Sequence, residues 1–145
     1  MFAVIFCIVC SCSNNRLRCG EYEATCIIEY TYFDEYGNIT REGTSPSNRP
    51  IEIYISKDES NEHDFRIWRS EMNEGSVITY ADVTKHGIEI LPCSYYNSDY
   101  RVGERNEFKF VKSKKDTLWI DELFIFLKNG NLLQSELRHY KAVKK

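Results

Sequence analysis

Alternation of apolar and polar residues is the feature that most restricts what this chain can fold into. In the segment 21–33, alternate positions are apolar or aromatic, and the positions between them are mostly Glu and Thr. The first set comprises Tyr22, Ala24, Cys26, Ile28, Tyr30 and Tyr32. Because successive side chains of a strand point to opposite faces of a sheet, this period of two predicts a half-buried β-strand.

Strand and turn signals continue along the chain. The segment 34–38, Asp-Glu-Tyr-Gly-Asn, has the composition of a turn, and a polar loop is expected from there to Pro50. Further strands are predicted at 51–55, 65–70, 77–83, 88–91, 108–111 and 119–127. The apolar residues that we expect in the core include Ile51, Ile53, Ile55, Phe124 and Phe126.

The C-terminal third contains the clearest hairpin signal. The run 123–127, Leu-Phe-Ile-Phe-Leu, lacks alternation, which indicates a central strand buried on both faces. Asn129-Gly130 follows, and these two residues readily adopt the positive φ angles of a type I′ turn. The segment 131–141 fits a strand, but Leu133, Leu137 and Tyr140 also have helical spacing. The preceding turn favours the strand.

About eight short strands, without another strong helical segment, predict an all-β fold. The sequence is compatible with an antiparallel β-sandwich or a small closed barrel. Residues 25–91 resemble the carboxypeptidase-regulatory-like, transthyretin-like sandwich modules, through the turn 34–38, the strand after Pro50 and the acidic turn Asn73-Glu74-Gly75. The resemblance implies a transthyretin-like sandwich used for adhesion, assembly or scaffolding, with no catalytic residues to carry over. An immunoglobulin-like sandwich and a small lipocalin-like β-barrel are the alternatives.

The N-terminal segment contains a candidate targeting signal for the cell envelope. Val9-Cys10-Ser11-Cys12 ends an apolar run that begins at Met1, and a polar stretch follows it. This segment resembles the lipobox of bacterial lipoproteins, which implies acylation of Cys12 with palmitate or a similar chain after removal of residues 1–11 as a signal peptide. Ser13 resembles the signal for sorting to the outer membrane. The alternative interpretation is a buried strand or helix at the start of a cytosolic domain.

The lipobox divides the chain into a signal segment (1–11), a tether (12–20) and a single all-β domain (21–145). A total of 145 residues fits one domain. The formal net charge is −3 and the basic residues are spread along the chain, which argues against nucleic acid as a partner. We expect the membrane as a partner through the lipid anchor, and another envelope protein or a glycan as the ligand.

Three cysteines, Cys19, Cys26 and Cys93, lie beyond the lipobox. An oxidising envelope would permit one disulfide among them, and the sequence does not select the pair. The three histidines lie far from any cysteine pair with metal-ligand spacing, and no metal or cofactor is expected.

No catalytic motif is found in the sequence, and we expect a protein that is not an enzyme. Asp121 and Glu122 are adjacent, so a strand would direct them to opposite faces, and with Asp116 they are interpreted as a solvated strand end. Asp34 and Asn38 are interpreted as turn residues and not as calcium ligands.

The best candidate for a partner-binding surface is the segment 92–101. It contains Tyr95, Tyr96 and Tyr100 among small polar residues, a composition found in recognition loops. The alternative is that these rings cover one end of the fold. The sequence therefore predicts an envelope lipoprotein with a non-catalytic binding or assembly domain, and a lipocalin-like carrier of a small apolar ligand or a periplasmic enzyme inhibitor as alternatives.

If Cys12 is the lipid site, metabolic labelling of cells with a fatty-acid analogue will label the wild-type protein, because the lipidated cysteine is the attachment point. The Cys12→Ala variant should take up no label, and Cys10→Ala serves as the matched control. Equal labelling of wild type and Cys12→Ala would exclude this site.

Overall fold

Every regular element of the described residues is a β-strand. The computed structural model describes residues 16–48, 50–70, 76–92, 94–97 and 102–145. The strands are β1 (Gly20–Phe33), β2 (Ile39–Pro46), β3 (Ile51–Lys57), β4 (Phe65–Ser70), β5 (Ser76–Thr84), β6 (Gly87–Ile90), β7 (Ser94–Asn97), β8 (Val102–Lys114), β9 (Thr117–Lys128) and β10 (Asn131–Lys144). The described residues contain no helix that could span a membrane. The expected all-β class is confirmed.

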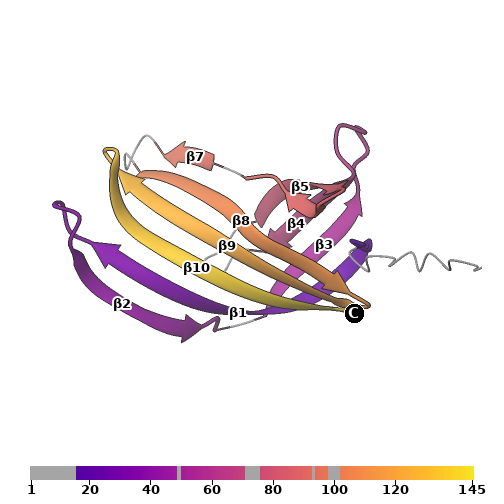
Figure 1. Cartoon of the computed structure of the whole chain (residues 1–145), viewed down its shortest axis with the longest axis horizontal. Helices are drawn as coiled ribbons and strands as arrows, with labels where there is room; N and C mark the ends of the chain where they lie inside the picture. Colours follow the sequence, from indigo (N-terminus) through magenta and orange to yellow (C-terminus); the bar gives the residue numbers. More distant parts are fainter. Residues whose placement is uncertain (1–15, 49, 71–75, 93, 98–101) are drawn as a thin grey trace, which may run out of the picture.

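The strands form one antiparallel sheet with the order β6-β5-β4-β3-β1-β10-β9-β8-β7, and β2 pairs with β1 beside this path (Figure 1). One run leads from β1 through β3, β4 and β5 to β6, and a second leads from β7 through β8 and β9 to β10. β1 pairs with β10 from Tyr22 to Tyr32, and this pairing joins the two runs.

Chain connectivity requires this sheet to curl. β6 and β7 stand at opposite ends of the sheet order, yet only residues 91–93 separate them. Eight strand spacings would put these strands roughly 38 Å apart in a flat sheet, whereas the connection spans about 14 Å when fully extended. The sheet is therefore nearly closed into a barrel. β6 approaches β8 to within 8 Å between Cα atoms, although the two are not hydrogen-bonded neighbours.

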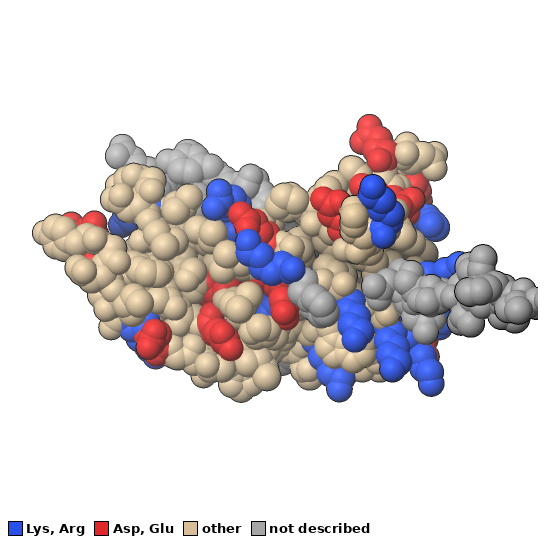
Figure 2. Space-filling view, in the orientation of Figure 1, with Lys and Arg blue, Asp and Glu red and all other residues tan. Residues whose placement is uncertain are grey.

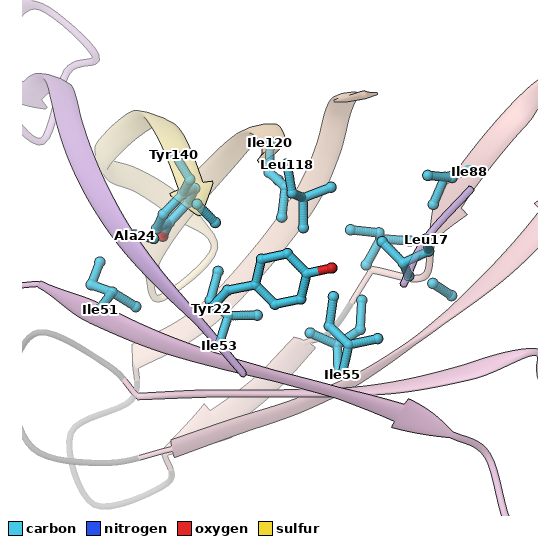
Figure 3. Close-up of a cluster of buried hydrophobic side chains, with 14 of the residues drawn as sticks. Leu17, Tyr22, Ala24, Ile51, Ile53, Ile55, Ile88, Leu118, Ile120 and Tyr140 are labelled. Carbon is cyan, nitrogen blue, oxygen red and sulfur yellow. The ribbon is translucent and has the colours of Figure 1, made fainter. Parts of the chain in front are cut away.

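A hydrophobic core fills the interior where β1 pairs with β3 (Figure 3). Leu17, which precedes β1, packs into this core from the N-terminal side. The largest contributions come from Tyr22, Ile51, Ile53, Ile55, Phe65, Ile67, Ile88, Ile90, Leu118, Ile120 and Tyr140. Of the predicted core residues, Ile51, Ile53, Ile55 and Phe124 are buried, whereas Phe126 is half-buried.

Two segments that were expected to be loops contain strands. The polar loop predicted between the turn at 34–38 and Pro50 contains β2, which pairs with β1 from Ile27 to Phe33. Most of its residues are exposed, so no apolar face marks the strand in the sequence. The segment 92–101 contains β7, which pairs with β8.

The C-terminal hairpin agrees with the sequence. Asn129 and Gly130 have φ angles of 53° and 81°, as a type I′ turn requires. Residues 131–144 form a strand, which confirms the favoured interpretation of this segment. β9 lies between β8 and β10, which confirms its central position, and the residues of the run 123–127 are buried or half-buried.

One half of the sheet extends beyond the core, and we call it the wing (residues 26–46, 94–97, 102–108 and 121–139). Its origin lies in β1, which pairs with β3 only from Gly20 to Ala24 and with β2 from Ile27 onward. β3, β4, β5 and β6 therefore continue the sheet beside one half of β1 only. In Figure 1 the wing extends to the left of these strands.

Truncation of Ile53 tests the core. Ile53 is 2% exposed, so Ile53→Ala should lower the free energy of unfolding by about 2–5 kcal/mol, through lost transfer energy and a cavity. Ile78, which is 41% exposed, provides the control, and Ile78→Ala should change stability far less. Urea denaturation of both variants measures the difference, and equal losses would contradict this account of the core.

Candidate functional site

We call the end of the wing at which β1 turns into β2 and β9 turns into β10 its tip. The side chains that point into the curled sheet change in chemistry from the core to this tip. The register of β1, β10 and β9 defines successive cross-strand rows. The rows are Ala24–Ala142–Leu118, then Cys26–Tyr140–Ile120, Ile28–Arg138–Glu122, Tyr30–Glu136–Phe124 and Tyr32–Gln134–Phe126. The interior is thus apolar in the core, ionic in the middle and aromatic with polar groups toward the tip.

The ionic rows contain a buried pair that crosses the interior. Glu122 on β9 is fully buried, and both of its carboxylate oxygens accept hydrogen bonds from the guanidinium of Arg69 on β4. Arg69 Nη2 lies 2.7 Å from Glu122 Oε1, and the Asn106 amide on β8 donates to the same oxygen. Charged side chains are rarely buried unless they are paired in this way. The pair therefore links β4 to the wing.

The interpretation of Glu122 as a solvated residue was wrong. The strand does direct Asp121 and Glu122 to opposite faces, as expected, but the inner face at Glu122 is closed. Asp121 lies on the outer face, where its Oδ1 is 2.8 Å from His139 Nδ1. Asp116 is exposed and pairs with Arg18. No sequence signal marks Glu122, because its partner Arg69 is 53 residues away.

A second charged pair joins Arg138, in the row of Glu122, to Glu136 in the next row toward the tip. Arg138 donates to Glu136 Oε2 through Nε and Nη2, each at 2.7 Å. Its guanidinium lies 3.9 Å from the centroid of the Phe124 ring, a cation–π contact. Gln134 Nε2 donates to the other oxygen of Glu136 at 2.6 Å. These contacts fix the charged groups beside an aromatic surface.

Aromatic rings line the inner face toward the tip. Tyr30 and Tyr32 make an edge-to-face contact with their ring centroids 5.7 Å apart, and Phe124 stacks on Phe126 at the same distance. Tyr32 is 37% exposed. The ring of Tyr30 lies over Gly43 on β2. If residue 43 had a side chain, its Cβ atom would be 2.5 Å from the hydroxyl oxygen of Tyr30. A glycine at this position therefore makes room for the ring.

The backbone register brings Tyr95, one of the predicted binding residues, into line with this aromatic row. Tyr95 lies on β7 opposite Glu104 of β8, and Glu104 pairs with Phe126. The same row continues through Gln134 and Tyr32 to Arg41 on β2. Tyr96 is the next residue of β7. Tyr100 lies outside the described residues. The register therefore aligns the backbone of Tyr95 with Phe126, Gln134 and Tyr32.

The cysteines are only partly described. Cys12 and Cys93 lie outside the described residues. Cys19 is exposed and Cys26 is buried, and both are free thiols, so these two do not form a disulfide with each other. Burial raises the pKa of the Cys26 thiol to about 11, which keeps it protonated at neutral pH.

The turn at 34–38 is stabilised by Asp34, as the sequence indicated. The backbone N–H groups of Tyr36 and Asn38 donate to Asp34 Oδ1, and the Asn38 side chain donates to both oxygens. These bonds, chiefly those from Asn38, lower the pKa of Asp34. Among the described residues, no group of three or more His, Cys, Asp or Glu could hold a metal ion.

A hollow of about 460 Å³ lies at the seam between β6 and β8. Ile88, Ile90, Phe108 and Val111 contribute apolar walls. Acidic and basic side chains alternate along the adjoining part of β8 (Figure 2), where Glu107 pairs with Arg105 and with Lys109. The seam is therefore an apolar hollow beside a charged strand.

Comparison with protein-family models and with curated proteins finds no match for this chain.

The buried pair can be tested with a double-mutant cycle. Glu122→Leu or Arg69→Met alone should lower the free energy of unfolding by about 3–5 kcal/mol, because each leaves an uncompensated buried charge. The double variant should lose much less than the sum of the two losses. Guanidinium denaturation measures all four proteins, and additive losses would contradict a direct interaction of the two side chains.

Proposed function

We propose that this protein is an envelope lipoprotein, tethered through Cys12, whose all-β domain is a non-catalytic binding module. We place the ligand on the inner face of the wing. The proposal rests on one observation above all: the cross-strand row from Arg41 through Tyr32 and Gln134 to Phe126 combines aromatic and hydrogen-bonding groups on one surface. The backbone register continues this row to Tyr95 on β7.

The chemistry of this row supports recognition of a ligand that is partly apolar and partly polar. Aromatic rings contribute large contact areas at a low cost in conformational entropy, and tyrosine adds a hydroxyl group. Arg41 lies over the Tyr30 ring at 5.5 Å, which holds its guanidinium at the inner edge of β2. A few fixed polar groups among apolar walls are typical of binding sites for small molecules and peptides.

The charged groups deeper in the interior support a structural role better than a catalytic one. Glu122 is held by Arg69 and Asn106, and Glu136 is held by Arg138 and Gln134. Both carboxylates therefore already accept hydrogen bonds from fixed donors. We infer that these pairs position the aromatic row and do not transfer protons to a substrate.

Photo-crosslinking in living cells tests the location of the site. A benzoylphenylalanine placed at position 32 or 95 should crosslink to a partner, because both positions belong to the aromatic row. Position 29 is the matched control, since Glu29 is exposed on the opposite face of the same strand. Crosslinks from position 29 together with none from positions 32 and 95 would reject the inner face as the site.

A second candidate function is the carriage of a small apolar ligand at the seam between β6 and β8. The apolar walls of the 460 Å³ hollow favour it, because ligand sites are commonly concave, largely apolar hollows of this size. The same experiment distinguishes the two candidates. Lys109 lines the seam, so a benzoylphenylalanine at position 109 should crosslink to a lipid if the seam carries the ligand. Such crosslinks, together with none from position 32, would support carriage at the seam.

A further inference from the structure

A second hollow, on the outer face of the sheet, lies outside the wing and does not depend on the function proposed for it. It has a volume of about 410 Å³ and is bounded by β1, β3, β4 and the end of the chain segment after β10. The residues that line it are Glu21, Tyr22, Glu52, Ile53, Tyr54, Trp68 and Lys145, of which Tyr22 and Ile53 direct their side chains into the core.

Two of the aromatic lining residues, Tyr54 and Trp68, lie on the outer face of the sheet. Tyr54 on β3 and Trp68 on β4 are directly opposite each other in the register. Tyr54 is 48% exposed and Trp68 is half-buried, so both rings are reachable from solvent. Side chains directly opposite on adjacent strands share one face of the sheet. The rings therefore offer a surface on which the C–H face of a sugar can pack.

One glutamate contacts the ammonium group of Lys145, and two more lie near it. Lys145 Nζ lies 3.1 Å from Glu52 Oε1, and the backbone N–H of Lys145 donates to the carbonyl oxygen of Glu21. Hydrogen bonding to Glu52, and then the charges of Glu52, Glu23 and Glu21, raise the pKa of Lys145. Three carboxylates thus favour a positive charge at one point beside the aromatic rings.

We propose that this hollow binds an amine-bearing saccharide. Its ring packs on Trp68 and Tyr54, and its ammonium group takes the place beside Glu52 that Lys145 now occupies. Glu21, which also lines the hollow, accepts hydrogen bonds from the sugar hydroxyls. Lys145 then acts as an internal competitor that the ligand displaces.

The chemistry of the hollow distinguishes this ligand from others. A purely apolar ligand would cover the carboxylates without satisfying them, which costs free energy. An anionic ligand would be repelled by Glu21, Glu23 and Glu52. A lysine side chain of a peptide would use one carboxylate, whereas a sugar ring with several hydroxyl groups and an amine uses both Glu21 and Glu52 together with the aromatic surface.

The experiment uses Trp68 as the reporter. The chain has two tryptophans, so Trp119→Phe in the full chain leaves Trp68 as the only one. Titration with a glucosamine oligomer should change the fluorescence of Trp68 in a saturable manner. The N-acetylated oligomer of the same length, which has no positive charge, should bind on the order of tenfold more weakly, because it lacks the charged hydrogen bond.

Four variants in the same background assign the contacts. Lys145→Ala should bind the glucosamine oligomer roughly two- to fivefold more tightly, because a surface ion pair no longer competes. Lys144→Ala is the matched control and should leave the affinity unchanged. Glu52→Gln should weaken binding, and Tyr54→Ala should weaken it on the order of tenfold, through the loss of an aromatic contact. Thermal melting of each variant checks that the fold is retained.

Several results would overturn the proposal. No saturable change in the fluorescence of Trp68 would reject the site, and equal affinity for the N-acetylated oligomer would reject the role of the amine. Equal effects of Lys145→Ala and Lys144→Ala would reject Lys145 as a competitor. A lysine oligopeptide that binds more tightly than the glucosamine oligomer would reject a saccharide as the ligand.

Discussion

β1 pairs with β10 from Tyr22 to Tyr32, and the architecture of the described chain depends on this pairing. Within each of the two runs most neighbouring strands are joined by short local connections, but the pairing of the first strand with the last joins the two runs across the whole sequence. Because the connection between β6 and β7 is also short, the joined sheet must curl and bring β6 close to β8. A nearly closed barrel thus follows from one long-range ladder and one short loop.

The change of partner along β1 divides the molecule into a filled part and a wing. Where β3 pairs with β1, the continuing strands β4, β5 and β6 contribute the apolar side chains that fill the core. Where β2 replaces β3, the sheet ends at an edge strand. The inner face of the wing therefore lacks an apolar layer from β5 and β6, and the pair of Arg69 with Glu122 supplies a link from β4 instead. Such a pair costs desolvation free energy, but it fixes one arrangement of the strands.

The sequence predicted the elements whose signal is local. The alternation in β1 and β3 and the Asn129-Gly130 turn depend on neighbouring residues, and these elements are found where they were expected. β2 was missed because an edge strand that is largely exposed carries no apolar face. The burial of Glu122 was missed because it depends on Arg69, a residue far away in the sequence. The sequence placed Tyr30 and Tyr32 on one face of a strand and Phe124 and Phe126 in the core. It did not indicate that these residues meet in two neighbouring rows, because the rows arise from the pairing of separate strands.

The distribution of charge follows from the same division. In the core, apolar side chains from both runs of strands meet. On the inner face of the wing, charged residues are kept only with fixed partners, as Arg138 is by Glu136 and Phe124. On the outer face beside β3, the glutamates are instead open to solvent around one lysine. Charged pairs with fixed partners keep the side chains of a surface in one arrangement. A lysine in an exposed ion pair is held more weakly and can be replaced by another cation. The two faces of the sheet therefore suit different kinds of ligand.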